Sequence, residues 1–402
     1  MKLIDKLNPD RFLINAKKKF GVLFEEHNLV LFCGIIIQTF LVLILAFSNK
    51  NIILDFFVAS FIFYLIAAKT VKKHSYEMFV LVLVFGFTFR FTICISSLLI
   101  NVSNSSSIFS GNYHKEYQVF KDISVFMSGN INKQFLIRAV IFLFEFSLLR
   151  VLIKIYEDRK HFFIHYFWNI PIIYEFYYRP NLIVVFLFLF FLSLYLAIYK
   201  KRFLSSIALA FSFFFNFGVF PFFAFFYKKI KWWLVLTVVL SASLILFAGY
   251  YKLLFSYMTT FQEIERGFVS LLSMLKLIIP STQIVMLFYY SLIISIVIYL
   301  IVKEVYIFDS IYFFLLTLLI INPNKEIGFI SFIMSFIIIF PNMGVVYFSL
   351  FLFIKVFLAG TFLTAFQMQA LNVITVLALY GYHVKILSHK VIYFYKHTLR
   401  KH

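Results

Sequence analysis

The 402-residue sequence is poor in cysteine, glycine, proline and charge. It contains 2 cysteines, 12 glycines and 7 prolines, and charged residues make up 13% of it. Cys33 and Cys94 each lie within an apolar run, which indicates small buried side chains rather than a disulfide or a metal pair. No Walker loop, dinucleotide-binding fingerprint or cysteine-rich zinc pattern is present. These common nucleotide and zinc sites are therefore excluded. No cofactor is predicted, and whether a divalent metal is needed stays open.

The sequence is instead rich in apolar residues. Hydrophobic residues make up 63% of the chain, 60 residues are phenylalanine, and apolar runs recur from Leu29 almost to the C-terminus. A water-soluble fold of this length cannot hide so many apolar side chains. A lipid bilayer can accept them, and it requires helices because backbone amides in hydrocarbon must be satisfied internally. The predicted fold is an all-α polytopic membrane protein with about 12 to 14 passes, some of them short or broken.

The predicted spans follow from the apolar runs and their interruptions. They cover Leu29–Phe47, Ile52–Ala68, Met78–Ile100, Phe135–Ile153, His161–Tyr178, Asn181–Tyr199, Phe203–Tyr227, Trp232–Tyr250, Gln283–Val302, Val305–Ile321, Ile327–Phe340, Gly344–Leu358 and Leu371–Leu387. Pro171 interrupts one of these runs, and a break at residues 216–221 is expected to turn another into a hairpin of two half-helices.

The charge of the chain is strongly one-sided. There are 37 lysines and arginines against 17 acidic residues, a formal net charge of +20. No soluble basic domain is present to bind nucleic acid, so contact with membrane lipids is the expected role of these charges. With basic tails 1–28 and 388–402 in the cytoplasm, the membrane domain 29–387 places nearly every basic cluster on the same side. The N-terminal segment is not interpreted as a signal peptide, because no small-residue cleavage site follows the first span.

In this topology, two long polar segments, 101–134 and 251–282, both lie outside. The first carries Asn112, His114, Glu116 and Asp122. A carboxylate within hydrogen-bond reach of a hydroxyl can act as a general base, so Glu116 and then Asp122 are the candidate bases, with His114 as another. A solvated loop without chemistry is the alternative. Within the second polar segment, an amphipathic interfacial helix is predicted over about 257–279.

Charged residues near or within the spans supply the remaining candidates. Glu175 and Arg179 are four residues apart at the predicted outer boundary, where they could pair on one helical turn or Arg179 could hold a phosphate. A boundary belt of Tyr, Trp and Arg is the competing interpretation. Arg90 and Glu145 lie well inside spans and could form a structural pair, while Arg138 is nearer the outer surface. Charges at such depth usually face a cavity or a partner.

The order of these parts resembles the C-type (GT-C) superfamily of membrane glycosyltransferases. The likeness covers about Met78–Tyr250. It begins with an arginine late in a span, Arg90, and an outer loop that contains Gly111-Asn112-Tyr113, Tyr117 and Ser128-Gly129-Asn130. It continues with an Asn-Pro-like element at Asn169–Glu175, a span, the basic turn Lys200-Lys201-Arg202 and a hairpin of half-helices ending at Pro221. The sequence departs from the superfamily where its acidic residue would fall near Asn112, so Glu116 takes that role or catalysis is lost. Asn216 stands where the family often has lysine. A looser likeness, through Arg179, is to exopolysaccharide and O-antigen polymerases.

The resemblance implies transfer of a sugar from a polyprenyl-phosphate-linked donor to a saccharide or lipid acceptor on the extracytoplasmic face, in a bacterial cytoplasmic membrane. Glu116, or Asp122, would then be the base. Arg179, Arg138 and Arg90 would neutralise the leaving phosphate, and Glu175, Asn112 and His114 would complete the substrate site. A polymerase, a transporter of lipid-linked saccharides and a catalytically inactive scaffold are the alternatives.

Overall fold

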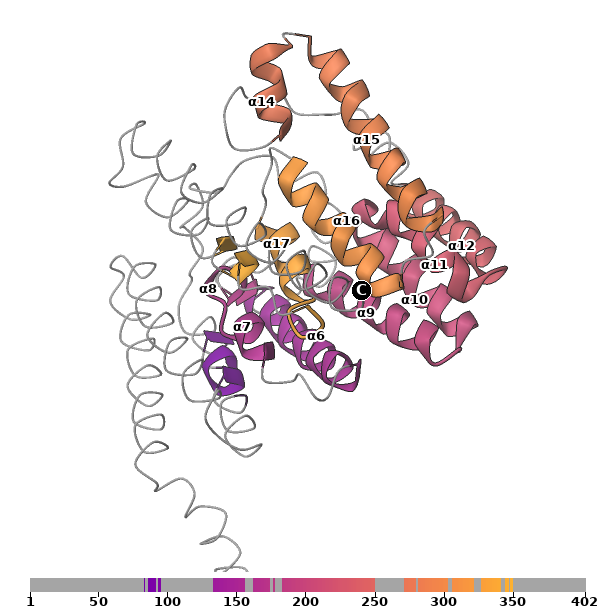
Figure 1. Cartoon of the computed structure of the whole chain (residues 1–402). Coiled ribbons are helices and arrows are strands. Elements are labelled where there is room, and N and C mark those ends of the chain that lie inside the picture. Colours follow the sequence, from indigo (N-terminus) through magenta and orange to yellow (C-terminus); the bar gives the residue numbers. More distant parts are fainter. Residues whose placement is uncertain are drawn as a thin grey trace, which may run out of the picture. The chain divides into compact units, whose positions relative to one another are not determined.

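The part of the chain that the computed structural model describes is mostly helical (Figure 1). The structure describes residues 83, 86–91, 93–94, 133–155, 162–173, 176–177, 183–249, 271–279, 281–302, 306–321, 327–340, 344–346 and 348–349, and no strand occurs among them. The chain divides into two compact units, residues 1–101 and 102–402. Cys94 in the first unit is buried, as the sequence predicts. Cys33 and the first two predicted spans lie outside the described residues.

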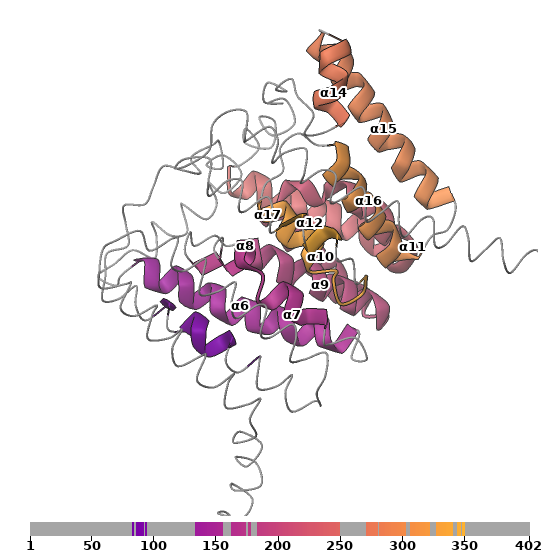
Figure 2. The ribbon, with the colours of Figure 1, turned by 60° about the vertical axis from the view of Figure 1, so that its left-hand side comes forward.

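The second unit is a bundle in which one apolar helix, α9 (Ile183–Ile198), has helices on several sides (Figures 1 and 2). It packs against α6, α10 and α11, and α10 packs in turn against α12. The elements in chain order are α6 Lys133–Ile155, α7 Phe163–Phe167, α8 Ile170–Ile173, α9, α10 Arg202–Phe215, η5 Phe217–Phe222, α11 Phe223–Ile230, α12 Trp233–Phe247, α14 Leu271–Ile278, α15 Thr282–Val302, α16 Ile307–Ile321 and α17 Ile327–Met334.

Most of the predicted spans in this unit coincide with helices to within a few residues, and two differ in an informative way. The run 161–178 breaks at Trp168 and Asn169, ahead of Pro171, because a proline ring clashes with the carbonyl four residues earlier and cannot continue α7. The run 327–340 ends as an α-helix at Met334 and continues in tighter turns, where Phe336 N donates to Ile333 O at 3.0 Å. Of the predicted interfacial helix 257–279, α14 forms the C-terminal part, and residues 250–270 lie outside the described ranges.

The predicted hairpin is confirmed. Helix α10 ends at Phe215, Asn216 adopts an extended conformation, and the 3₁₀ turn η5 contains Pro221 before α11 begins. Asn216 N still donates to Ser212 O at 3.0 Å, so the residue closes α10 rather than interrupting it. Because α10 and α11 pack against each other and against η5, the run folds back on itself as two half-helices.

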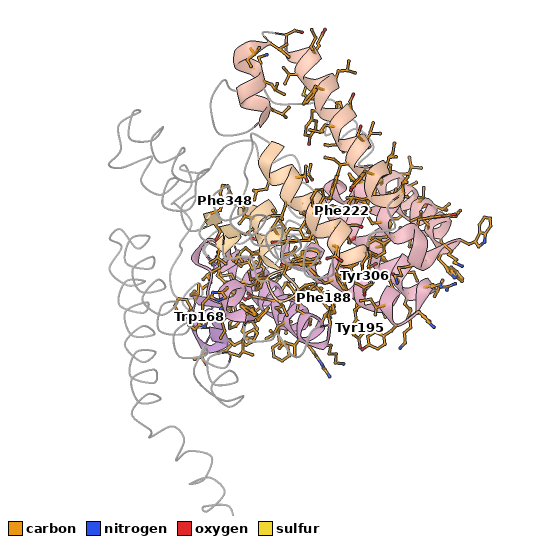
Figure 3. The ribbon with its side chains drawn as sticks, viewed as in Figure 1. Trp168, Phe188, Tyr195, Phe222, Tyr306 and Phe348 are labelled. Atoms are coloured by element: carbon orange, nitrogen blue, oxygen red, sulfur yellow. The ribbon has the colours of Figure 1, made fainter. Side chains whose placement is uncertain are left out.

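Phenylalanine side chains form the centre of the bundle (Figure 3). Phe332 of α17 is 5% exposed and packs its ring against five others, with centroid separations of 4.9 to 6.5 Å: Phe186, Phe190, Phe191, Phe222 and Phe336. Most of these pairs meet edge to face, the arrangement that the ring quadrupole favours. The cluster joins α9, η5 and α17, so a good share of the phenylalanine content serves packing between helices.

Small hydroxyl side chains allow α9 and α10 to approach closely. Ser193 Oγ donates to Ser205 O at 3.0 Å, and Ser205 Oγ donates to Ser193 O at 2.9 Å. Both serines are fully buried. On the other side of α10, Thr237 Oγ1 of α12 contacts Ser206 O at 3.4 Å. Small residues at helix contacts with such reciprocal hydrogen bonds are typical of helices that associate without water.

The basic connections gather at one end of the bundle. Phe203, at the start of α10, and Trp233, at the start of α12, meet edge to face at 5.3 Å, which brings the turns at 199–202 and 231–232 together. Lys229 Nζ lies 5.5 Å from the centre of the Tyr306 ring, which adds the beginning of α16 to the same end. The sequence predicts these connections on one side of a membrane, and the structure brings them together at one end of the bundle.

The basic C-terminus of α6 belongs to this end too. Phe144 of α6 packs against Phe188 of α9 at 5.4 Å, and Arg138, earlier on α6, contacts Tyr177, which precedes α9. The two contacts progress in the same direction along both segments, so α6 and α9 run parallel and their C-termini lie at the same end. The last turn of α6 carries Lys154, which is exposed.

One described helix is long and apolar enough to cross a membrane: α15, over Gln283–Val302. Only 17% of its apolar window is buried. Shorter apolar helices cover Ile183–Ile198, Arg202–Phe215, Trp233–Phe247 and Ile307–Leu319. The outer faces of α12 and α15 expose large apolar side chains, among them Val235, Val239, Leu246, Ile284, Leu287, Ile294 and Ile298.

Candidate functional site: the buried Arg138–Tyr177–Glu145 network

Helix α6 carries two charged residues on its buried face. Arg138 and Glu145 are seven residues apart, which is close to two turns of helix and places them on one side. They are 2% and 0% exposed. The same face carries the buried apolar residues Ile141, Leu148 and Leu152, and the opposite face exposes Leu143 and Phe146. The burial of Arg138 and Glu145 therefore follows from the register of α6.

Tyr177 bridges the two charges. Its backbone carbonyl accepts a hydrogen bond from Arg138 Nε at 2.5 Å, and its hydroxyl donates to Glu145 Oε2 at 2.6 Å. The second distance is typical of a hydroxyl bound to a carboxylate. Tyr177 is itself fully buried and lies with Phe176 in a short π-helical turn. The network fixes the chain at residue 177 against the first half of α6, and we call it the Arg138–Tyr177–Glu145 network.

A second buried polar contact lies at the break between α7 and α8. Asn169 Nδ2 donates to Ser349 Oγ at 2.8 Å, across 180 residues of sequence. Its carbonyl also accepts from Ile173 N at 3.0 Å and so starts α8. Asn169 is fully buried, and its Oδ1 accepts no hydrogen bond from the described residues. Asn169, predicted as part of the Asn-Pro-like element, thus ties the break to a late segment of the chain.

Three of the sequence-predicted candidates are described: Arg138, Glu145 and Arg90. Arg138 belongs to the network, where its guanidinium holds a backbone carbonyl. Arg90 is fully buried in the first unit and donates from Nη1 to Gly86 O at 3.2 Å. Its pairing with Glu145 stays a prediction. The other candidates lie outside the described residues: Asn112, His114, Glu116, Asp122, Glu175 and Arg179.

Tyr177 is the residue that sequence reasoning missed. It sits in an aromatic run, Tyr174-Glu175-Phe176-Tyr177-Tyr178, in which each tyrosine fits a boundary belt equally well. The available signal was Glu145, because a carboxylate in an apolar span needs a hydrogen-bond donor. Nothing in the sequence indicates which tyrosine supplies it.

Removing the Tyr177 hydroxyl is expected to destabilise the protein. Tyr177→Phe removes one hydrogen-bond donor from the buried Glu145 carboxylate, and a hydrogen bond to a charged group contributes about 1.5–3 kcal/mol. The matched control is Tyr227→Phe, because Tyr227 is 59% exposed. Unfolding of the two variants in denaturing detergent, followed by circular dichroism, measures the difference. Equal midpoints would show that the Tyr177–Glu145 hydrogen bond contributes nothing to stability.

Comparison with known proteins returns no relative. The chain matches no protein-family model, no curated protein and no solved structure. The function must therefore be argued from the residues of this chain.

Proposed function

We propose that this protein is a polytopic membrane glycosyltransferase. It would transfer a sugar from a polyprenyl-phosphate-linked donor to an acceptor hydroxyl on the extracytoplasmic face. The observation that carries the proposal is the Arg138–Tyr177–Glu145 network. It holds the chain two residues before Arg179, and α6 follows directly on the outer segment that carries Glu116 and Asp122.

The membrane placement is supported by exposed apolar surface. Helix α15 is apolar along its length and largely exposed, unlike the core helix of a soluble protein. The exposed side chains of α12 add to this surface. A soluble monomer rarely exposes an apolar surface of this extent, whereas lipid covers it without cost. The basic connections at one end of the bundle agree with the positive-inside rule.

The proposed reaction needs a base and a cationic group at the leaving phosphate. The bond between the anomeric carbon and the phosphate oxygen of the donor breaks, and polyprenyl phosphate leaves with the electron pair. The acceptor oxygen forms the new bond to the anomeric carbon, and its proton passes to Glu116. Arg179 neutralises the charge that develops on the leaving phosphate. Arg138 acts as a positioning residue, because its described hydrogen bond is to the chain and not to a cavity.

The wild-type chain reconstituted in lipid vesicles tests the proposal. We expect a panel of polyprenyl-phosphate-linked hexoses, offered with an extract of membrane saccharides and lipids, to give new glycosidic bonds. Each bond should release one polyprenyl phosphate. Chromatography of the labelled sugar and a phosphate-ester assay of the lipid measure the two products.

The same vesicles separate the rival functions. Movement of the labelled donor across the bilayer without release of polyprenyl phosphate would show a transporter and overturn the proposal. A product containing many repeat units, each transferred as a preassembled oligosaccharide, would assign the chain to the polymerases instead. Transfer that appears only when a second protein co-purifies would indicate a scaffold.

A further inference from the structure

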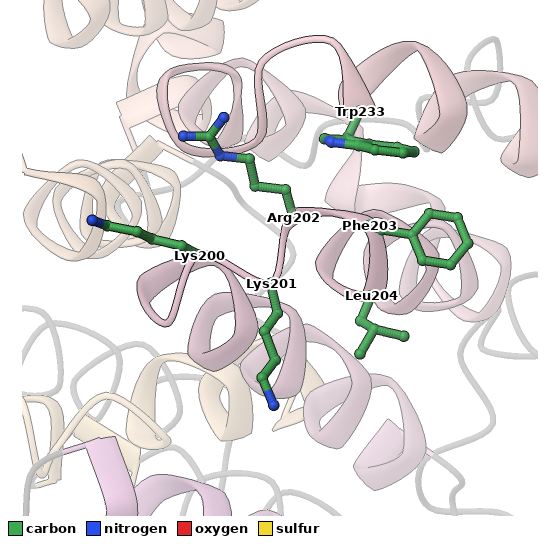
Figure 4. Close-up of a pocket in the computed structure, with 6 residues that line it drawn as sticks. All are labelled: Lys200, Lys201, Arg202, Phe203, Leu204 and Trp233. Carbon is green, nitrogen blue, oxygen red and sulfur yellow. The ribbon is translucent and has the colours of Figure 1, made fainter.

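A shallow cavity lies at the basic end of the bundle. It has a volume of about 460 Å³ and is lined by Lys200, Lys201, Arg202, Phe203, Leu204 and Trp233. In Figure 4, Arg202 and the Trp233 indole extend to the same side of the connection between α9 and α10, and the two lysines extend in other directions around it. Three of the six lining residues are cationic, and the described lining contains no acidic side chain.

The backbone around this cavity is unusual. Lys200 has a φ of 60° and Lys231 a φ of 50°, a left-handed conformation that glycine adopts more easily. Lysine side chains are thus present at two neighbouring turns where a residue without a side chain would be less strained. Helix α10 begins at Arg202 with no side-chain cap, so the amide groups of its first turn add positive potential to the same place.

The surroundings indicate a lipid interface rather than open solution. Large aromatic side chains are exposed beside the cations: Tyr199, Phe203, Trp232, Trp233 and Tyr306. Trp232 is 86% exposed. Tryptophan and tyrosine next to lysine and arginine are typical of the level of the lipid headgroups. The apolar outer face of α12 begins at Trp233 and would lie along the acyl chains.

We propose that this cavity binds the headgroup of an anionic phospholipid. The phosphate would lie beside Arg202 and the first-turn amides of α10, with Lys200 and Lys201 adding positive potential around it and the indole of Trp233 against the glycerol region. The inference rests on the membrane placement within the proposed function, but not on sugar transfer. Nucleic acid fits poorly, because apolar side chains of α12 would have to stay in water beside it.

Tryptophan fluorescence measures this binding directly. The chain has 3 tryptophans, of which Trp168 is 2% exposed, Trp233 lines the cavity, and Trp232 is the exposed residue before it. In vesicles, lipids brominated near the headgroup quench an indole that they contact. We expect brominated phosphatidylglycerol to quench at a surface fraction at least about tenfold lower than brominated phosphatidylcholine, since each engaged cation favours anionic lipid by about fivefold.

Two charge-matched variants locate the preference. Lys200→Asn, Lys201→Gln and Arg202→Gln together remove three charges at the cavity, and asparagine tolerates the left-handed conformation at position 200. Arg150→Gln, Lys154→Gln and Lys276→Gln together remove three charges elsewhere. The first variant should lose the preference for phosphatidylglycerol, and the second should keep it within about twofold. Lys201→Gln alone changes an exposed residue and should lower the preference for phosphatidylglycerol by about fivefold. This single variant tests the site if the triple variant does not fold.

Each other result overturns the proposal. Equal loss in both triple variants would show that net charge alone attracts the lipid. No preference in the wild type would remove the site. Selective relief of quenching by millimolar inorganic phosphate, against sodium chloride of equal ionic strength, would identify free phosphate as the ligand. Absence of quenching by either lipid would show that the chain does not insert, which overturns the membrane placement and the headgroup site together.

Discussion

Glu116→Gln is expected to abolish sugar transfer in reconstituted vesicles while leaving the protein folded. A positioned general base contributes about 10² to 10⁴ in rate, and glutamine keeps the shape of glutamate but cannot accept the proton. The loss should appear in kcat, with KM for the lipid-linked donor nearly unchanged, because the substitution removes an interaction made in the transition state. Initial rates of product formation at several donor concentrations measure both constants.

Two further variants make this result specific. Asp122→Asn tests the second candidate base and should reduce transfer less than Glu116→Gln does. Glu265→Gln removes a carboxylate of 251–282, the other segment predicted to lie outside, and should leave kcat unchanged. Undiminished transfer by Glu116→Gln would remove Glu116 from the mechanism. Equal loss in all three variants would point to a general effect of acidic residues on the outer face.

Phe332→Ala is expected to lower the free energy of unfolding more than the other substitutions proposed in the bundle. The ring contacts five other phenylalanine rings, so its removal leaves a cavity that none of the neighbours can fill alone. In water-soluble cores a change from Phe to Ala costs about 3–5 kcal/mol. Within a bilayer the unfolded helix keeps its phenylalanine in hydrocarbon, so only the packing part is lost, and about 2–3 kcal/mol is expected.

The control for this prediction is on the neighbouring helix. Phe313 of α16 is 51% exposed, so Phe313→Ala should lower the free energy of unfolding by less than about 1 kcal/mol. Phe332→Leu should recover part of the loss, because leucine refills some of the volume. Reversible unfolding in mixed micelles gives the three free energies. A loss for Phe332→Ala no greater than that for Phe313→Ala would show that the phenylalanine cluster is loosely packed.

The helical part of the bundle was largely predictable. In a sequence with long apolar runs, the ends of helices are marked by charges and by the few proline, glycine and asparagine residues. The hairpin of α10 and α11 illustrates this, since its break coincides with Asn216 and Pro221. The common end of the basic connections was also predictable, because a single topology satisfies the charge pattern.

The partners of the buried polar groups were not predictable. Ser193 and Ser205, or Glu145 and Tyr177, are joined only after the helices have packed, and no periodicity reveals which hydroxyl faces which carbonyl. The spacing of apolar residues also gives little information in α9 and α15. These helices are hydrophobic on every face, so the pattern does not show which face packs against a neighbour. The early end of α17 was not predictable either, because residues 329–340 contain no proline or glycine that would mark the change to tighter turns.

The reciprocal serine bonds between α9 and α10 have a consequence for biosynthesis. Alone, α10 would enter the proposed membrane with the hydroxyl of Ser205 facing acyl chains instead of Ser193 O. It is also less apolar on average than α9. Joined to α9 by a turn of three residues, 199–201, it presents that hydroxyl to a neighbour instead. In the proposed membrane placement, the two helices should therefore leave the translocation channel as a single hairpin. A nascent chain stalled just after α9 should remain in contact with the channel. A nascent chain long enough to include α10 should be released into the bilayer.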